Sequence, residues 1–418
     1  MSNLKTARQL LRIAALLILL LLVVSSSKLS AQEKERGFYL ESHTFPKDST
    51  AEVVFSYRIP YEKIIFIKEN GRYSSSIEIS LEILSNDEVV KREYSQKQIV
   101  LSDYLETRSA SNFVEGLIIT ELPINSYKVL PSYKSDYSNK RISFKQIDLA
   151  INKDSTGILN PIIVDRSSDG RFHLLNQNGE ISFSPHNQYF VIPARNDVEQ
   201  LEVTVNQDEK IISKKKLDLH KKGSPKYVAD GSIQFVIDTT KLDYSFFILE
   251  NISRKLKEGK SSFTLSHGKE VKTYELSVVW HNKPKSLNDG KIAIQLLSNI
   301  VPKSEVEKLL DNNEEKYLNT LSKFWEKYDK KTDTEFNEIM NEFYERCDYA
   351  IENFNTLNKQ NGAESDRGKI YIKYGSPDSI ERNYSDKDEV IELWKYEKLQ
   401  KEFVFIDTSR LGNYILAK

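Results

Sequence analysis

The hydrophobic period of this chain changes near Val301, and this change limits the folds that the chain can adopt. From about residue 37 to residue 280, apolar side chains recur at every second position, as in strands with one solvated face. From Val301 to about residue 354 they recur at every third or fourth position, as in amphipathic helices. The pattern therefore predicts a multidomain protein of 418 residues, in which β-rich modules precede an α+β domain.

The first β-rich region, residues 32–153, has the pattern of a sandwich. Ile77, Ile79, Leu81 and Ile83 alternate with polar residues, and Asn70-Gly71 is a strong hairpin signal before them. Short strands separated by turn signals predict a β-sandwich of the immunoglobulin-like type.

The second β-rich region, residues 154–285, predicts another sandwich of similar size. Asn178-Gly179 marks a hairpin, and Leu201, Val203 and Val205 alternate with polar residues. The polar segment 281–290 is interpreted as a linker to the last domain, residues 286–418.

Two helices are predicted next, each with a capping box at its start, Ser304–Glu307 and Thr332–Glu335. Cys347 lies on the apolar stripe of the second helix and is interpreted as a small buried hydrophobe. Glu338 and three other glutamates on the opposite face are interpreted as a solvated surface and not as metal ligands, because no histidine accompanies them. The stripe comprises Phe336, Ile339, Met340, Phe343, Cys347, Ala350, Ile351 and Phe354.

The segment DRGKIYIKYGSPDS, residues 366–379, follows these helices. Ile370 and Ile372 alternate with polar or amphipathic residues and predict a strand, which ends at a turn over Gly375–Asp378. Three further strand-like pieces follow, at 393–396, 403–407 and 414–416. Two or three helices packed on a small antiparallel sheet are therefore expected at the C-terminus.

The N-terminus predicts export. A basic segment precedes the apolar run Ile13–Val24, and a small-residue stretch ends at Ala31, which is the layout of a signal peptide cleaved before Gln32. The apolar run is shorter than a spanning helix requires, which is about 20 residues, and no later segment is long and apolar enough to span a bilayer. The expected location is periplasmic or at the cell surface.

Composition argues against several classes of site. The net charge is −1 and would become −5 without the four basic residues of the signal segment; opposite charges are interspersed, so nucleic-acid binding is not expected. A single cysteine excludes disulfide frameworks and thiolate metal clusters. The histidines are scattered, and neither a nucleophile elbow nor a phosphate loop is present, so no catalytic, metal or cofactor site is assigned.

The last hundred residues resemble the GWxTD domain of exported bacterial proteins. The residues that carry this resemblance, with either a structural or an interaction role, are Trp325, Asn337, Glu338, Arg346, Asp366, Arg367, Gly368, Gly375, Pro377, Asp378, Trp394, Tyr396 and Asp407. The signature itself reads Gly362-Ala363-Glu364-Ser365-Asp366, with alanine in place of tryptophan and serine in place of threonine. The resemblance implies an envelope location and no established activity.

Two functions remain open at this stage. The first is a non-catalytic binding or assembly module with a protein or glycan partner in the cell envelope, and the second is an envelope hydrolase with a carboxylate-based site. Asp366 and Arg367 also have two interpretations. They either hold the loop through an ion pair with a helix carboxylate such as Glu338, or they line a binding cleft.

Overall fold

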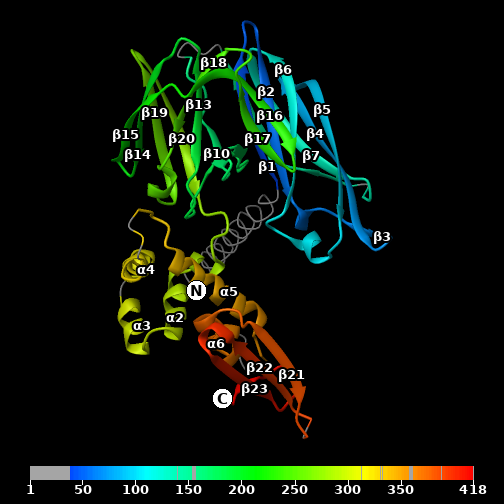
Figure 1. The fold of residues 1–418 in the computed structure, drawn as a ribbon, viewed down its shortest axis with the longest axis vertical. Helices are drawn as coiled ribbons and strands as arrows, with labels where there is room; N and C mark the ends of the chain where they lie inside the picture. Colours follow the sequence, from blue (N-terminus) through cyan, green and yellow to red (C-terminus); the bar gives the residue numbers. More distant parts are fainter. Residues whose placement is uncertain are drawn as a thin grey trace, which may run out of the picture. The chain divides into compact units, whose positions relative to one another are not determined.

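The computed structural model describes residues 38–138, 140–152, 157–311, 313–329, 331, 333–356, 361–386 and 388–417 (Figure 1). The signal segment and its cleavage site lie outside these residues. The described residues form two compact units: the first runs to residue 182 and includes 187–253 and 259–279, and the second comprises 183–186, 254–258 and everything from residue 280. The coarse prediction of a mostly β protein with helices near the C-terminus is confirmed.

The N-terminal module of the first unit consists of two antiparallel sheets. One sheet has the order β1-β2-β6; in the other, β3, β4, β7 and β8 are neighbours in that order, β5 pairs with β4, and β9 pairs with β7. The predicted alternation is confirmed, because Ile77, Ile79, Leu81 and Ile83 are fully buried. The strands are β1 (Tyr39–Pro46), β2 (Thr50–Pro60), β3 (Ile67–Glu69), β4 (Arg72–Ser85), β5 (Glu88–Leu101), β6 (Phe113–Pro123), β7 (Asn125–Ser135), β8 (Arg141–Ser143) and β9 (Ile147–Ile151).

The second module of this unit combines a closed path of six strands, β10-β11-β17-β16-β18-β13, with a five-stranded sheet, β12-β20-β19-β14-β15. Its strands are β10 (Ile162–Arg166), β11 (Phe172–Leu174), β12 (Ile181–Ser182), β13 (Tyr189–Arg195), β14 (Gln200–Gln207), β15 (Lys210–Asp218), β16 (Lys221–Asp230), β17 (Ser232–Asp238), β18 (Tyr244–Leu249), β19 (Gly259–His267) and β20 (Glu270–Val279).

Strand β2 is buried on both faces and joins the two modules. Val53 and Phe55 belong to the core of the N-terminal module, whereas Val54 packs in a second cluster with Phe45 and Phe246 of β18. Since successive side chains of a strand point to opposite faces, β2 contributes to two hydrophobic cores at once.

The Asn178-Gly179 prediction is wrong in part. Both residues have positive φ and form a turn, but β11 and β12 on either side of it do not pair with each other. Instead the turn binds β1: Glu41 Oε1 accepts hydrogen bonds from the backbone N–H of Gln177 (2.9 Å) and of Gly179 (2.6 Å), and Asn178 Oδ1 accepts one from Leu40 (2.9 Å). The turn residues thus serve a contact between modules, and not a hairpin.

The second unit contains more helices than expected. Its α-helices are α2 (Gly290–Leu296), α3 (Lys303–Leu310), α4 (Tyr317–Glu326), α5 (Glu338–Asn353) and α6 (Asp366–Tyr374), and its strands are β21 (Ser379–Tyr384), β22 (Val390–Tyr396), β23 (Lys401–Asp407) and β24 (Ile415–Leu416). The four strands form one antiparallel sheet in sequence order. The segment predicted as a linker is part of this unit, with Leu287 buried.

Two predictions of local structure are wrong here. Neither capping box is used: Pro302 precedes α3, so Ser304 lies inside that helix, and Asn337 caps α5 by accepting a hydrogen bond from Met340 N–H. Thr332 lies outside the described residues. The segment Ile370–Lys373 is helical and not a strand, because Ser365 caps a helix there and its buried residues, Gly368 and Ile372, are spaced by four.

The buried carboxylate of Glu41 should make the first unit sensitive to acid. Burial alone would raise its pKa, but His43 and the two backbone N–H groups outweigh burial, so the pKa of Glu41 lies below the usual 4.5. A lowered pKa adds stability at pH values above 4.5, and this stability is lost as the pH falls through the lowered value.

We expect Glu41→Gln to lower the unfolding free energy at pH 7 by about 2 kcal/mol, because a neutral amide oxygen accepts the two backbone hydrogen bonds more weakly than a carboxylate oxygen and the charge beside His43 is lost. Denaturant unfolding at pH 7 and at pH 3 measures the change, with exposed Glu69→Gln as the control. The loss should shrink at the lower pH. An equal loss at both values would show that the Glu41 charge does not contribute.

Candidate functional site

The signature segment begins α6. Asn361 accepts a hydrogen bond from Ala363 N–H at the start of the short 3-10 turn Gly362–Glu364. Ser365 is the N-cap of α6: its Oγ accepts from Gly368 N–H (3.0 Å) and donates to the Gly362 carbonyl (2.7 Å). The serine thus does the capping that a threonine hydroxyl would also provide.

Two glycines of this segment allow backbones to approach closely. A Cβ on Gly362 would lie 2.0 Å from the carbonyl oxygen of Ala350, near the end of α5, and a Cβ on Gly368 would lie 2.0 Å from the carbonyl oxygen of Gly362. Any side chain at either position would therefore separate α5, the 3-10 turn and α6.

Asp366 and Arg367 both connect α6 to the sheet. Asp366 Oδ2 accepts a hydrogen bond from the backbone of Leu416 in β24 (3.0 Å). Arg367 does not pair with Glu338, which binds Lys331 instead (2.6 Å). The partner of Arg367 is Glu392 of β22, whose Oε2 lies 3.3 Å from Arg367 Nη1.

Glu392 is a buried carboxylate between two arginines. Arg382 of β21 binds its second oxygen, and Trp394 Nε1 lies 3.4 Å from the first. Burial would raise the pKa of Glu392, but the two guanidinium groups outweigh burial and lower it. Arg367 also lies over the Tyr414 ring, with its Cζ 3.9 Å from the centroid. Glu392 was missed by sequence reasoning; its alternation with Trp394 and Tyr396 on one strand was the available signal.

The Gly375–Asp378 turn joins α6 to β21, and not one strand to another as predicted. Gly375 has φ +81° and ψ −159°, a conformation open almost only to glycine. Its carbonyl accepts a hydrogen bond from the Tyr396 hydroxyl (2.9 Å), and Asp378 accepts one from Glu397 N–H (2.7 Å). Arg346 of α5 lies beside Gly375, and the intervening Pro377 is half-buried.

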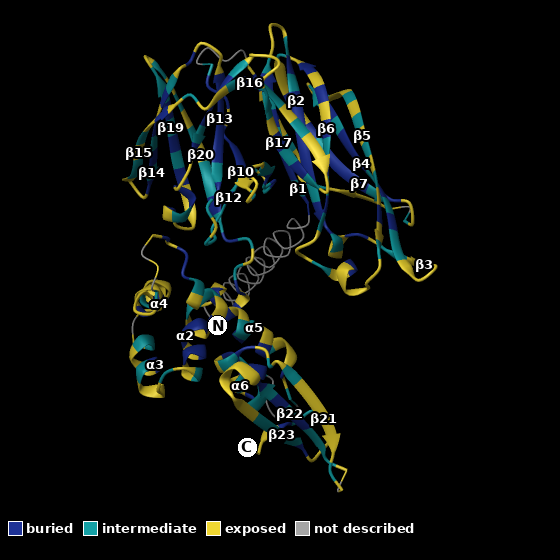
Figure 2. Ribbon diagram, in the orientation of Figure 1, coloured by how far each residue is buried: buried dark blue, intermediate teal, exposed yellow. Residues whose placement is uncertain are grey.

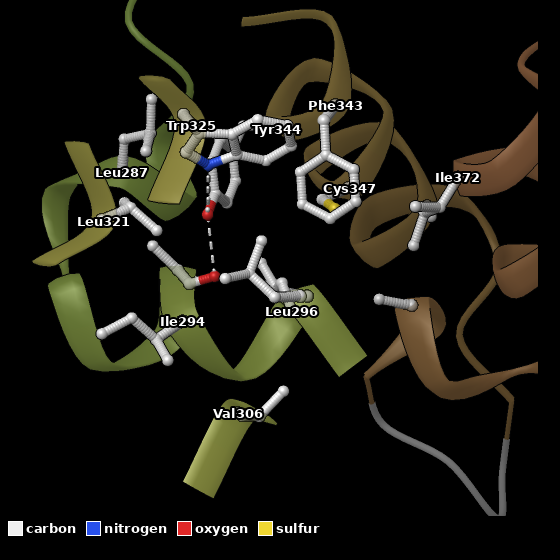
Figure 3. Packing of buried hydrophobic residues seen from close by; sticks show 14 of the residues in the cluster. Leu287, Ile294, Leu296, Val306, Leu321, Trp325, Phe343, Tyr344, Cys347 and Ile372 are labelled. Atoms are coloured by element: carbon white, nitrogen blue, oxygen red, sulfur yellow. Dashed lines mark hydrogen bonds between the residues drawn. The ribbon is translucent and has the colours of Figure 1, made fainter. Parts of the chain in front are cut away.

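Among the remaining motif residues, Trp325 lies in the helical core, close to Tyr344 (Figure 3). Asn337 caps α5 and donates from Nδ2 to the Trp325 carbonyl (3.1 Å), which connects α4 to α5. Tyr344, which the sequence did not single out, is fully buried, and its hydroxyl donates to the Ala293 carbonyl of α2 (2.9 Å). Asp407 accepts hydrogen bonds from Ser409 and Gly412 in the loop before β24. Each contact is internal to the domain.

A groove of about 820 Å³ lies beside the signature, and we call it the signature groove. Its aliphatic lining comes from Ile292, Leu296, Val306 and Ile370, and Ala363 stands in the position of the signature tryptophan. The complete lining is Ile292, Gln295, Leu296, Ser298, Asn299, Lys303, Val306, Glu307, Asn361, Ala363, Glu364, Lys369, Ile370 and Lys373.

Three exposed lysines line this groove, Lys303 of α3 and Lys369 and Lys373 of α6. None of them forms an ion pair with a carboxylate of the described residues; Lys373 lies 5.5 Å from the centre of the Tyr374 ring. Two carboxylates, Glu307 and Glu364, also line the groove, so its charged side chains leave an excess of one positive charge. The groove thus combines aliphatic surface with a small positive excess.

Chemically reactive groups are sparse in the described part of the chain. No group of three or more histidine, cysteine or acidic side chains there could hold a metal ion, and no described helix has the length and apolar character needed to cross a membrane. Cys347 is buried, and burial raises the pKa of its thiol.

One carboxyl group does have a raised pKa in a hollow. Glu115 of β6 lines a hollow of about 340 Å³ in the first unit together with Glu106. Burial raises its pKa, while the charge of Arg58 and a backbone hydrogen bond from Ile233 lower it to a smaller extent.

Comparison with known proteins finds a domain family that matches the C-terminal part of the chain. The family model described as the GWxTD domain matches residues 262–416. No curated protein matches the chain. Among solved structures, the purple acid phosphatase PPD1 from yellow lupin seeds (Lupinus luteus) aligns over 63% of this chain, which spans half of the phosphatase, with 10% identity and a TM-score of 0.17.

The network around Glu392 predicts a stability effect at Arg367. We expect Arg367→Ala to cost about 2 kcal/mol, because Glu392 keeps Arg382 but loses one charged hydrogen bond, and Tyr414 loses its cation. Thermal or denaturant unfolding of the chain measures the loss, and Lys398→Ala, an exposed lysine in the turn after β22, is the control. An unchanged stability would show that Arg367 does not hold α6 on the sheet.

Proposed function

We propose that this chain, whose residues 262–416 match the GWxTD domain, is an exported cell-envelope protein that binds or assembles with a partner and catalyses no reaction. In this proposal the two β-rich modules are sandwiches of the immunoglobulin-like type that present the C-terminal domain, and the signature groove is the binding site. The observation that carries it is an aliphatic groove lined by three lysines and only two glutamates, which leaves an excess of one positive charge.

The chemistry of the groove selects a protein segment with apolar side chains next to carboxylates. Aliphatic side chains at the floor favour an apolar anchor, and the lysines favour negative charge beside it. Among the described residues that line the groove, none is a histidine or cysteine, which suits recognition better than catalysis.

Four residues in or next to the signature segment support this role without lining the groove. Gly362, Ser365, Asp366 and Gly368 make contacts inside the domain that fix the 3-10 turn and the start of α6. A rigid wall needs little ordering when a partner binds, which favours affinity.

One observation favours the alternative of an envelope hydrolase. A general acid needs a carboxyl group with a raised pKa, and Glu115 has one, in a hollow that also contains Glu106. The positive charge of Arg58 lowers the pKa of Glu115 and so disfavours the protonated carboxyl group that a general acid needs. The geometry therefore supports the binding function better.

Crosslinking from the groove tests the binding function. We expect a photoreactive residue at Lys369, introduced into the full chain in cells, to capture a discrete envelope protein, because this lysine lines the groove. The same residue at Lys398 is the control. Adding Lys303→Glu and Lys373→Glu should remove the adduct, because both changes repel a carboxylate. An adduct that resists protease would identify a glycan and contradict the choice of a protein segment; equal capture at both positions would contradict the site.

The hydrolase alternative makes a separate prediction. If Glu115 were a general acid, the purified chain would release soluble fragments from isolated envelope polysaccharide and protein, and Glu115→Gln would reduce the rate about 100-fold or more. We expect no release above that of a buffer control from either variant. Release that depends on Glu115 would replace binding with catalysis as the function.

A further inference from the structure

The C-terminal sheet has one covered and one uncovered face. Trp394 and Phe405 are buried against the helical core, and their neighbours on the same strands therefore point the other way. These neighbours are aliphatic and only half-buried or exposed. They form what we call the open sheet face: Ile391 and Leu393 of β22, Val404 and Ile406 of β23, and Ile415 of β24.

These five side chains form one continuous patch. The strand register places Leu393 opposite Val404, Ile391 opposite Ile406, and Ile406 opposite Ile415, which is 55% exposed. Directly paired residues have Cβ atoms about 5 Å apart, so the five side chains contact one another in two adjacent rows.

The sequence of these strands suits a sheet covered on both faces. Phe403–Ile406 is an unbroken apolar run, and β22 carries apolar side chains on both of its faces. A strand with one solvated face normally alternates between apolar and polar residues, whereas continuous apolar runs belong to strands covered on both sides. The open sheet face therefore has the composition of an interface.

At one end of the patch, a positive and a negative side chain lie on adjacent strands, so two copies of the patch can place opposite charges together. Lys395 of β22 lies opposite Glu402 of β23 in the register, one step along the strands from Leu393 and Val404. Glu381 of β21 also binds Lys395. Consider two copies of this sheet stacked face to face about a two-fold axis that runs parallel to the strands, between β22 and β23. The rotation then places β22 of each copy over β23 of the other copy.

We propose that the open sheet face is the dimer interface of this protein, and that its occupant is a second copy of the same face. Stacked about this axis, Leu393 faces the partner's Val404, Ile391 faces the partner's Ile406, and Lys395 faces the partner's Glu402, each contact occurring twice. Two sheets packed in this aligned way cross at about 30° and lie about 10 Å apart. The apolar centre with a charged end is the usual anatomy of such an interface.

An edge strand in the first unit has the opposite composition to the open sheet face. Strand β15, at the edge of its sheet in the first unit, carries four lysines, Lys210, Lys214, Lys215 and Lys216, which discourage association. The strands that form the open sheet face carry aliphatic side chains instead. Figure 2 shows the neighbouring edge strand β21 as largely exposed.

Sedimentation equilibrium of the mature full chain tests the proposal. We expect a reversible dimer that Leu393→Lys together with Ile406→Lys converts to a monomer. Ile380→Lys, an exposed apolar residue on the opposite face of the same sheet, is the matched control and should leave the dimer intact. Far-UV circular dichroism and the melting temperature confirm that each variant is folded.

Charge reversal tests the two-fold arrangement itself. Lys395→Glu and Glu402→Lys should each weaken the dimer by about tenfold or more, and the double variant should restore most of the affinity, because the exchanged charges again face each other. A chain that remains monomeric at about 100 µM would overturn the proposal. A dimer that survives the lysine substitutions, or a double variant that stays as weak as the single variants, would also overturn it.

Discussion

The close approach of three backbone segments at Gly362 is the constraint on which the C-terminal domain depends. The end of α5, the 3-10 turn and the start of α6 meet at distances that leave no room for a Cβ at Gly362 or Gly368. This contact fixes the direction of α6, so that Arg367 reaches Glu392 on one side, while Lys369 and Lys373 line the groove. The fold contact and the proposed binding site are therefore two consequences of one piece of backbone geometry.

Strongly periodic segments could be predicted from the sequence, because each uses one interaction repeated many times. The alternation over Ile77–Ile83 and the stripe through Phe343, Cys347 and Ala350 both correspond to buried faces. Ile339, placed on the same stripe, is 42% exposed, since it lies in the first turn of α5. The number of sheets and their pairing could not be predicted, because register between distant strands is set by packing and not by local pattern.

Short segments were harder to predict, because several local rules fit them equally well. Ile370–Lys373 alternates like a strand, yet the cap at Ser365 and the four-residue spacing of Gly368 and Ile372 make it a helix. Ion-pair partners could not be predicted for the same reason: the sequence contains many acidic residues that could pair with Arg367, and the packing of α6 against the sheet selects Glu392. The lysines of the groove come from two helices that are distant in sequence, α3 and α6, so no single motif contains all three.

Strand β2 has a consequence for the order in which the chain can fold. One of its faces is covered by β4, which follows soon after it, but Val54 on the other face is covered by side chains such as Phe246, which are synthesised much later. Until β18 has been made, an apolar sheet face stays uncovered, which is a hazard for aggregation. The two modules thus cannot complete their cores one after the other, and a chain cut between them would keep that face bare.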